Sequence, residues 1–298
     1  MVELPLIESH NILNQPEVLR QRLEADGYLF FRNLLERESL LNVRRQFLEI
    51  CREHGWLLNG GDIMEGRGRA EAYSGYFEFT PVYADIQRLE DFHALPHHPK
   101  IVNTLATVLG GTIFPHPRNI ARITLAGSLK MTTPPHQDYV FIQGTRRVYT
   151  VWFPLSDCPR PLGGLGIAAG SHRLGVLPIK EAAGTGGLCA DVDENKLEWH
   201  IGDFNLGDAI IFHALLVHKG YHNTTPETLR LSCDFRYQLA SEPIVWDTIR
   251  PHMQLHSWET IYSNWKSDTY KYYWQKHALQ VVPGVHPENV PPDAAGGQ

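Results

Sequence analysis

Hydrophobic residues recur at helical spacing in the first part of the chain. Within Glu36–His54, the residues Leu40, Val43 and Phe47 lie three or four positions apart, and charged residues fill the intervening positions. This spacing predicts an amphipathic helix over the whole range. Shorter patterns of the same kind predict three further helices, at Pro16–Ala25, Tyr83–Phe92 and Pro99–Leu109. We therefore expect a helical N-terminal part over residues 16–110.

From Thr112 onward, short apolar runs replace the helical spacing, and Gly, Pro, Asn and Asp separate them. The predicted strands are Ile113–Phe114, Asn119–Ala126, His136–Gln143, Arg147–Trp152, Leu165–Ala168, His200–Phe204, Ala209–Phe212, Leu216–Gly220 and Leu229–Tyr237, with an earlier one at Tyr28–Phe31. Many short strands at short intervals favour a β-sandwich or barrel, and an eight-stranded jelly roll is the natural solution. We expect a mainly β fold with flanking helices, with the jelly-roll core over residues 112–238 of a single domain, residues 1–282.

Three segments lie outside this pattern. Residues 58–72 contain four glycines among charged residues and predict a long loop; a substrate lid and an ordinary surface loop both remain open. Residues 241–282 are rich in aromatics, and Ser257–Lys276 is expected to be helical. Packing of this segment on the core or on a second copy of the chain is favoured over a place in a substrate pocket. Residues 283–298 predict a disordered tail.

Composition and charge narrow the class of protein. The formal net charge of −6 argues against nucleic-acid binding, which needs a basic surface. The four cysteines show neither zinc-site nor disulfide spacing, so we expect reduced thiols in a cytoplasmic protein. The N-terminus lacks the pattern of a secretory signal, and no apolar run approaches membrane-spanning length. We expect no membrane association.

Candidate metal ligands stand at the middle of the predicted core. His136 and Asp138 lie two residues apart, so on an extended strand both side chains would face the same side. His218, on a later strand, would complete a 2-His-1-carboxylate set, which suits non-heme Fe(II) with open positions. Twelve residues further on, Arg230 and Ser232 share a strand face. A guanidinium and a neighbouring hydroxyl can together bind a carboxylate.

These residues also occur in a characteristic order: His136-Gln137-Asp138, Trp152, Gly170-Ser171-His172, Gly207-Asp208, His218 and Arg230-Leu231-Ser232. In this order the chain resembles the phytanoyl-CoA dioxygenase family of Fe(II)- and 2-oxoglutarate-dependent oxygenases. The segment DGYLFFRNLL, residues 26–35, resembles the opening strand of that family. The resemblance extends over residues 26–237 and implies a double-stranded β-helix (jelly roll, cupin-like).

The resemblance also implies roles for individual residues. Fe(II) would be held by His136, Asp138 and His218, and 2-oxoglutarate and O2 would take the remaining positions. Arg230 and Ser232 would hold the distal carboxylate of 2-oxoglutarate, and Gln137 and Trp152 match positions that line its pocket. His172, His213 and His222 are expected not to be ligands.

The implied reaction is hydroxylation of a C–H bond of a small molecule, with release of succinate and CO2. The carboxylate Asp138 favours hydroxylation over halogenation, because halogenating relatives lack this ligand. Candidate substrate contacts are Arg122, Tyr139 and Trp199. A cupin-like metal-binding protein or a Zn(II) hydrolase with the same ligands remains the alternative, although a hydrolase would not need Arg230. A homo-oligomer could form through the aromatic C-terminal segment.

Overall fold

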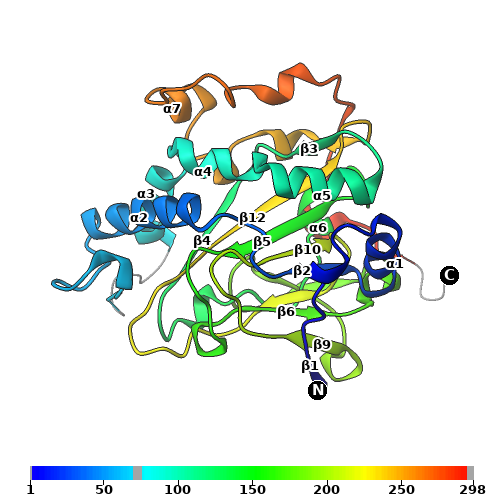
Figure 1. The fold of residues 1–298 in the computed structure, drawn as a ribbon, viewed down its shortest axis with the longest axis horizontal. Helices are drawn as coiled ribbons and strands as arrows, with labels where there is room; N and C mark the ends of the chain where they lie inside the picture. Colours follow the sequence, from blue (N-terminus) through cyan, green and yellow to red (C-terminus); the bar gives the residue numbers. More distant parts are fainter. Residues whose placement is uncertain (1, 70–75, 294–298) are drawn as a thin grey trace.

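Two β-sheets face each other at the centre of the computed structural model, which describes residues 2–69 and 76–293 (Figure 1). The major sheet has the strand order β2-β10-β5-β12-β3, with β4 paired to β12, and the minor sheet has the order β1-β9-β6-β11. The strands of the major sheet are β2 (Tyr28–Phe31), β3 (Ile113–Pro115), β4 (Ile120–Thr124), β5 (Tyr149–Pro154), β10 (Ala209–His213) and β12 (Arg230–Leu239). Those of the minor sheet are β1 (Val2–Pro5), β6 (Leu165–Ala168), β9 (Glu198–Ile201) and β11 (His218–Gly220). This architecture is a double-stranded β-helix, as the sequence predicted.

The ten-residue strand β12 separates two chemically different sides of the major sheet. Alternate residues point to opposite faces of a strand. One face carries the buried polar residues Arg230, Ser232, Asp234, Arg236 and Gln238. The other face carries the buried apolar residues Leu231, Cys233, Phe235 and Tyr237. The apolar face therefore belongs to the main hydrophobic core, and the polar face is left for the space between the sheets.

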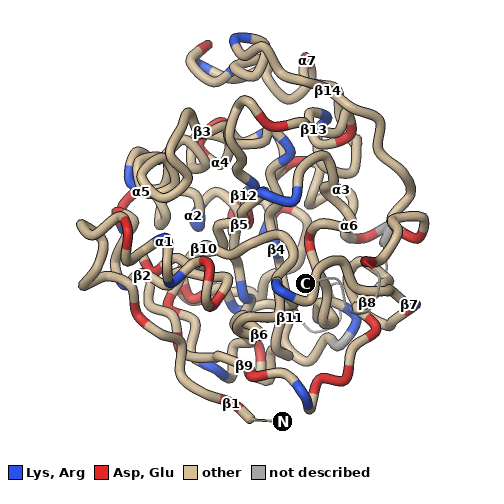
Figure 2. Tube along the Cα trace, turned by 90° about the vertical axis from the view of Figure 1, so that its right-hand side faces the viewer, with Lys and Arg blue, Asp and Glu red and all other residues tan. Residues whose placement is uncertain are grey.

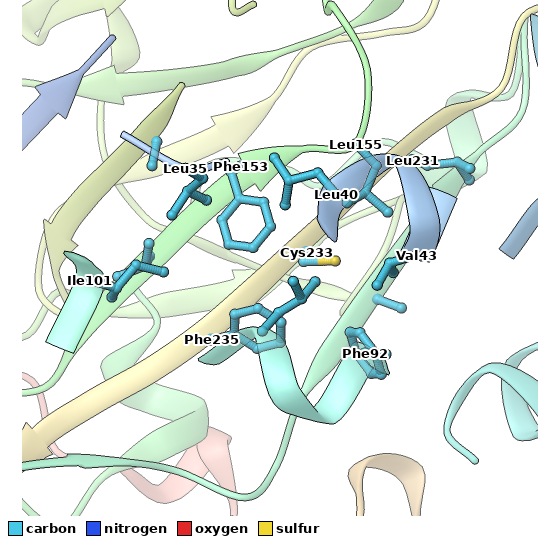
Figure 3. Packing of buried hydrophobic residues seen from close by; sticks show 14 of the residues in the cluster. Leu35, Leu40, Val43, Phe92, Ile101, Phe153, Leu155, Leu231, Cys233 and Phe235 are labelled. Carbon is cyan, nitrogen blue, oxygen red and sulfur yellow. The ribbon is translucent and has the colours of Figure 1, made fainter. Parts of the chain in front are cut away.

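Helices cover the apolar face of the major sheet (Figure 1). They are α1 (Pro16–Asp26), α2 (Arg37–Glu53), α3 (Tyr76–Ile86), α4 (Glu90–Ala94) and α5 (Pro99–Leu109). Figure 3 shows side chains of α2, α4 and α5 packed around Cys233 and Phe235 of β12. Each fully buried large apolar side chain contributes about 1.5–3 kcal/mol to folding. The helical layer thus covers the apolar face of the major sheet, and the opposite, polar face of β12 remains available to form a functional site.

The helix predicted at Tyr83–Phe92 is instead divided between α3 and α4. The chain leaves helical geometry around Arg88, whose carbonyl accepts a hydrogen bond of 2.9 Å from the indole of Trp265. The side-chain amide of Gln87 donates to the carbonyl of Asn119 at 3.2 Å. Tertiary hydrogen bonds therefore outweigh helix propensity at this point.

The single helix predicted over Ser257–Lys276 is wrong. Only α7 (Trp258–Tyr262) is α-helical there, and a 3₁₀ turn follows at Tyr273–Lys276. The backbone amides of Lys266 and Ser267 donate to the carboxylate of Glu90 at 2.8 and 2.9 Å, in place of helical hydrogen bonds.

The aromatic residues of this segment pack within the chain. The cluster contains Tyr262, Trp265 and Trp274 with Phe114 of β3, and the hydroxyl of Tyr273 donates to the carbonyl of Pro115 at 2.7 Å. Most of this aromatic surface is therefore already used inside the chain. Association of two copies through the segment stays a prediction.

The predicted tail and loop are both tied to the rest of the molecule where the structure describes them. Residues 283–293 were expected to be disordered, yet Asp293 pairs with Arg146 and accepts a hydrogen bond from the backbone of Val176. Residues 294–298 lie outside the described residues. In the loop at 58–72, Arg44 of α2 donates to the carbonyl of Met64 at 2.8 Å, and residues 70–72 lie outside the described part.

Acidic and basic residues are interspersed along the trace (Figure 2). Within residues 2–69 and 76–293, none of the helices has both the length and the hydropathy needed to cross a lipid bilayer.

Candidate metal centre

His136 and His218 are brought together by an antiparallel β-bridge. Each backbone N–H donates to the other residue's carbonyl, at 2.9 and 3.0 Å, and the ring centroids lie 4.1 Å apart. The Nδ1 atom of His136 lies 2.9 Å from the carbonyl oxygen of Pro134, and that of His218 lies 3.0 Å from the carbonyl oxygen of Leu216. A carbonyl oxygen only accepts, so Nδ1 carries the proton in both rings. Both Nε2 lone pairs are therefore free to bind a metal.

Asp138 lies beside the two imidazoles, but not on the strand that the sequence predicted. The segment His136–Gln143 is not a strand: Asp138 has helical angles, φ −62° and ψ −28°, and is the N-cap residue of the short helix α6 (Tyr139–Ile142). The chain turns here because the backbone N–H of Tyr139 donates to the carbonyl of Ala214 at 3.0 Å. A turn, rather than a shared strand face, thus places the carboxylate beside the imidazoles.

The three side chains form a compact, buried donor set. Their ligand atoms lie within 4.8 Å of one another, and Oδ1 of Asp138 is 3.7 Å from Nε2 of His136 and 4.0 Å from Nε2 of His218. Burial opposes ionisation of Asp138, but nearby positive charge, led by that of Arg236, outweighs it, so the pKa of Asp138 lies well below its ordinary value. Burial and the neighbouring His136 lower the pKa of His218 to about 3. An ionised carboxylate and a neutral imidazole are the forms that bind a metal, and two histidines with one carboxylate are a donor set that fits Fe(II).

A narrow cavity runs from the candidate ligands His136 and His218 to Arg230, with Trp152 and Phe212 in its wall. Arg230 is buried, and its guanidinium reaches only hydroxyl groups: Ser232 at 3.2 Å and Thr124 at 2.7 Å. Its Nε–H has no hydrogen-bond partner, and no carboxylate of the described residues pairs with it. A buried charge without a counter-charge is costly, so this arrangement fits a carboxylate ligand.

A wide cavity of about 470 Å³ also reaches the donor set, with His136 and Asp138 in its wall. Most of its remaining wall is apolar, and includes Phe79, Ile120, Ile123, Met131, Phe141, Ile142 and Met253. This volume lies in the range of small-molecule sites. The donor set therefore borders two cavities, one suited to a carboxylate and one suited to a largely apolar molecule.

Comparison with known proteins agrees with this geometry. A model of the phytanoyl-CoA dioxygenase family matches residues 23–231 of the chain. The chain belongs to this family. It is 26% identical over 257 residues to 1-deoxypentalenic acid 11-beta-hydroxylase of Streptomyces exfoliatus, a match that covers 80% of this chain and 87% of the relative. It is 24% identical to human peroxisomal phytanoyl-CoA dioxygenase, over 72% of this chain and 67% of the relative.

Solved structures show the same fold. The nogalamycin epimerase SnoN, in complex with Fe3+, alpha ketoglutarate and nogalamycin RO, matches with a TM-score of 0.53 at 19% identity, over 77% of this chain and 85% of that one. EvdO2 of Micromonospora carbonacea var. aurantiaca, complexed with 2-oxoglutarate, matches with a TM-score of 0.52 at 18% identity, over 73% and 88% of the two chains. At these identities the likeness concerns the fold.

As a member of the phytanoyl-CoA dioxygenase family, the protein is a 2-oxoglutarate-dependent non-heme oxygenase that uses Fe(II), 2-oxoglutarate and O2. The oxygenase assignment disfavours the alternatives left open by the sequence, a Zn(II) hydrolase and a non-catalytic metal-binding protein. Roles of individual residues follow from the contacts above and stay predictions: the iron ligands, and Arg230 with Ser232 for the distal carboxylate of 2-oxoglutarate.

The sequence interpretation missed a buried chain of charges that holds Asp138. Arg236 donates to Oδ1 of Asp138 at 2.9 Å and to Asp234 at 2.7 Å. Asp234 in turn accepts two hydrogen bonds from Arg122, at 2.9 and 3.0 Å. Thr150 donates its hydroxyl to Oδ2 of Asp138. Both oxygens of the candidate iron ligand are thus oriented by the protein. The alternating polar residues of β12 were the available signal for Asp234 and Arg236.

The other predicted site residues divide into two groups. Arg122 lines both cavities and Trp152 lines the narrow one. Gln137 lies outside both walls, because its side-chain amide donates to the carbonyls of Gly175 and Leu215 and accepts from the backbone of Leu177. It anchors the turn that carries the ligands.

Two predicted substrate contacts lie away from the cavities. Trp199 is inside β9, fully buried, with its ring under the ammonium of Lys219 at 4.1 Å and its indole N–H bonded to the carbonyl of Glu194. Tyr139 packs in small apolar clusters with Val140 and Ile142. Neither side chain lines the wide cavity, and for both the geometry indicates a structural role.

Proposed function

We propose that the protein hydroxylates an unactivated C–H bond of a small-molecule substrate, with release of succinate and CO2. The observation that carries this proposal is the wide cavity, whose largely apolar wall reaches His136 and Asp138. An apolar molecule bound there would present C–H bonds, rather than ionised or hydrogen-bonded groups, to the metal ligands. The relative named 1-deoxypentalenic acid 11-beta-hydroxylase supports hydroxylation as the reaction.

In this proposal the residues of the chain mainly position the reactants. His136, Asp138 and His218 would hold the iron, and bound iron supplies the activation of O2 that couples decarboxylation of 2-oxoglutarate to oxidation of the substrate. Arg230, with Ser232, would orient 2-oxoglutarate through its distal carboxylate. Such positioning fixes which C–H bond is presented to the metal.

The buried charges and apolar walls have supporting roles. Arg236 and Thr150 hold the carboxylate of Asp138 in one orientation. The apolar wall of the wide cavity limits the access of water, which would otherwise compete with the substrate for the reacting centre. The presence of Asp138 favours hydroxylation over halogenation.

The fold itself does not select hydroxylation among oxidations. The solved structures that match this chain include an epimerase, a carbocyclase and a monooxygenase. The reaction must therefore be tested on products. The test is a screen of small molecules for substrate-dependent succinate release, followed by mass spectrometry of the product formed under isotopically labelled O2.

We expect a product that contains one oxygen atom derived from labelled O2, and no product with the His136→Ala variant. A product without that oxygen, such as an alkene or an epimer of the substrate, would contradict hydroxylation while leaving the oxygenase assignment in place.

A further inference from the structure

Arg118 is a cation in the wall of the wide cavity that no acidic residue of the described part of the chain neutralises. It lies in the loop between β3 and β4 and is half-buried. Within the described residues it forms no hydrogen bond and no ion pair. Asp247 is close enough to attract Arg118 electrostatically, but it is exposed and forms no ion pair with Arg118. Burial lowers the pKa of Arg118, as expected for a guanidinium that has lost water without gaining a carboxylate.

The other buried cations of the wide cavity are neutralised within the chain. Arg122 is bound to Asp234, and Arg236 to both Asp234 and Asp138. Lys130 also lines the cavity but is exposed, so water solvates its ammonium. Arg118 is thus the half-buried cation of this wall without a counter-charge among the described residues.

His252 places a second donor in the same wall. The hydroxyl of Tyr83 accepts from the backbone N–H of Ala121 and lies 2.6 Å from Nδ1 of His252. The described residues offer the hydroxyl proton of Tyr83 no other acceptor, so it is donated to Nδ1, and the proton of the neutral ring lies on Nε2. Nε2 forms no hydrogen bond with the described residues, and His252 lines the cavity. Burial and the charges of Arg118, Arg122 and Arg236 hold the pKa of His252 well below its ordinary value, which keeps the ring neutral.

The backbone beside His252 is in an unusual conformation. Met253, which also lines the cavity, has φ +57°, and Gln254 has φ +50°. Left-handed angles at non-glycine residues cost free energy and tend to occur at ligand sites. The segment that carries His252 is therefore held against this wall at some cost to stability.

We infer that Arg118 and His252 form a carboxylate-binding subsite in the wide cavity, and that the substrate is an apolar molecule with one carboxylate. This inference rests on the proposed function, because it treats the wide cavity as the substrate site. One guanidinium without a counter-charge matches one negative charge, and its planar fork matches the two oxygens of a carboxylate. The Nε2–H of His252 adds a neutral donor to the same anion. Anchoring the carboxylate there fixes which carbon lies next to His136 and Asp138.

The test uses protein loaded with Zn(II) and excess 2-oxoglutarate, so that Arg230 is already occupied. The probes are adamantane-1-carboxylate and decanoate, each compared with its uncharged primary amide by isothermal titration calorimetry. The variants are Arg118→Gln and His252→Phe. The matched control is Arg45→Gln, which removes the same charge from an exposed position of α2 outside the cavity.

We expect the wild type and Arg45→Gln to bind at least one of the two acids about tenfold or more tightly than its amide, as charge-assisted hydrogen bonds allow. Arg118→Gln should lose this preference, and His252→Phe should reduce it. Arg118→Gln should also melt no lower than the wild type, since it removes an uncompensated charge; a structural role for Arg118 predicts lower stability instead. Equal binding of acid and amide by the wild type, binding of neither acid, or an unchanged preference in Arg118→Gln would overturn the inference.

A spectrum of the Fe(II) protein with 2-oxoglutarate distinguishes the two possible failures. If the iron and 2-oxoglutarate signature forms and no acid is preferred, only the carboxylate subsite is wrong. If the signature does not form, the proposed function fails, and with it the assignment of a bound acid as substrate.

Discussion

The protonation of two histidines determines what the site can bind. Backbone carbonyls at Pro134 and Leu216 hold the protons on Nδ1, so that the Nε2 atoms of His136 and His218 point at Asp138. The backbone contacts of the fold alone therefore fix the tautomers of both histidines. His222 lies close in sequence, yet its Nδ1 faces the hydroxyl of Thr132 at 3.5 Å, and it does not belong to the donor set.

The His136→Ala variant tests the donor set directly. It should lose most iron binding and all detectable turnover while the far-UV circular dichroism spectrum is retained, because one of three ligands is removed from a packed scaffold. Iron content by elemental analysis is the measurement. His222→Ala is the matched control and should bind iron as the wild type does. Full iron content in His136→Ala would show that the ligand set is wrong.

The Arg230→Gln variant tests the proposed 2-oxoglutarate contact. Loss of a charged, carboxylate-binding side chain should weaken 2-oxoglutarate binding about 10- to 100-fold, the equivalent of about 1.5–3 kcal/mol. Iron affinity should change little, since Arg230 does not contact the ligands. The dissociation constant of 2-oxoglutarate for the Zn(II) protein is the readout, with the surface variant Arg147→Gln as control. An unchanged constant in Arg230→Gln would remove this residue from the co-substrate site.

At the scale of the elements, β12 joins the site to the hydrophobic core. Its polar face carries Arg230, Asp234 and Arg236, and its apolar face packs beneath the helices (Figure 3). The element was predictable because its residues alternate. The role of Asp234 and Arg236 could also have been found from this alternation, since both lie an even number of residues from Arg230 and so share its face.

The Asp234→Asn variant tests whether Asp234 neutralises the buried arginines on the polar face of β12. Asp234 pairs with both Arg122 and Arg236, so the variant leaves two buried guanidinium groups short of negative charge. Breaking a buried ion pair costs about 3–5 kcal/mol, and we expect a clear fall in the free energy of unfolding measured with denaturant. Asp268→Asn, at an exposed surface pair, should be close to neutral. A neutral result for Asp234→Asn would mean that water or other groups compensate these charges.

The structure of other elements could not be predicted from the local sequence pattern. A strand was expected at His136–Gln143, but hydrogen bonds from distant segments turn the chain into α6. A long helix was expected over Ser257–Lys276, but the carboxylate of Glu90 accepts hydrogen bonds from the backbone of a turn there. Arg118 and His252 lie far apart in the sequence, and no local pattern indicates that they line one wall. In each case a contact between distant residues decides the outcome.

At the scale of the whole molecule, buried histidines make stability depend on pH. Burial lowers the pKa of His93 to about 4 and that of His116 to about 3, from an ordinary value of 6.5. Between pH 6.5 and these lowered pKa values, the unfolded chain binds more protons than the folded chain. The stabilising contribution of the neutral histidines is therefore complete above pH 6.5 and falls as the pH drops toward 4. Each such group contributes about 1.4 kcal/mol per pH unit in this window.

Thermal unfolding at several pH values checks this dependence. The melting temperature should fall between pH 7 and pH 4, and it should fall less steeply in His116→Gln, which removes one buried titrating group. His10→Gln, at an exposed position, should follow the wild type. If His116→Gln has the same slope as the wild type, protonation of His116 does not contribute to acid unfolding.

The measurement that tests the central claim most directly is an anaerobic titration of metal-free protein, first with Fe(II) and then with 2-oxoglutarate. A 2-oxo acid bound through two atoms to iron of a facial triad gives a weak visible charge-transfer band. The account predicts this band in the wild type, its loss in His136→Ala, and a need for more 2-oxoglutarate in Arg230→Gln. Absence of the band in the wild type, with tight binding of Zn(II) instead, would contradict the account.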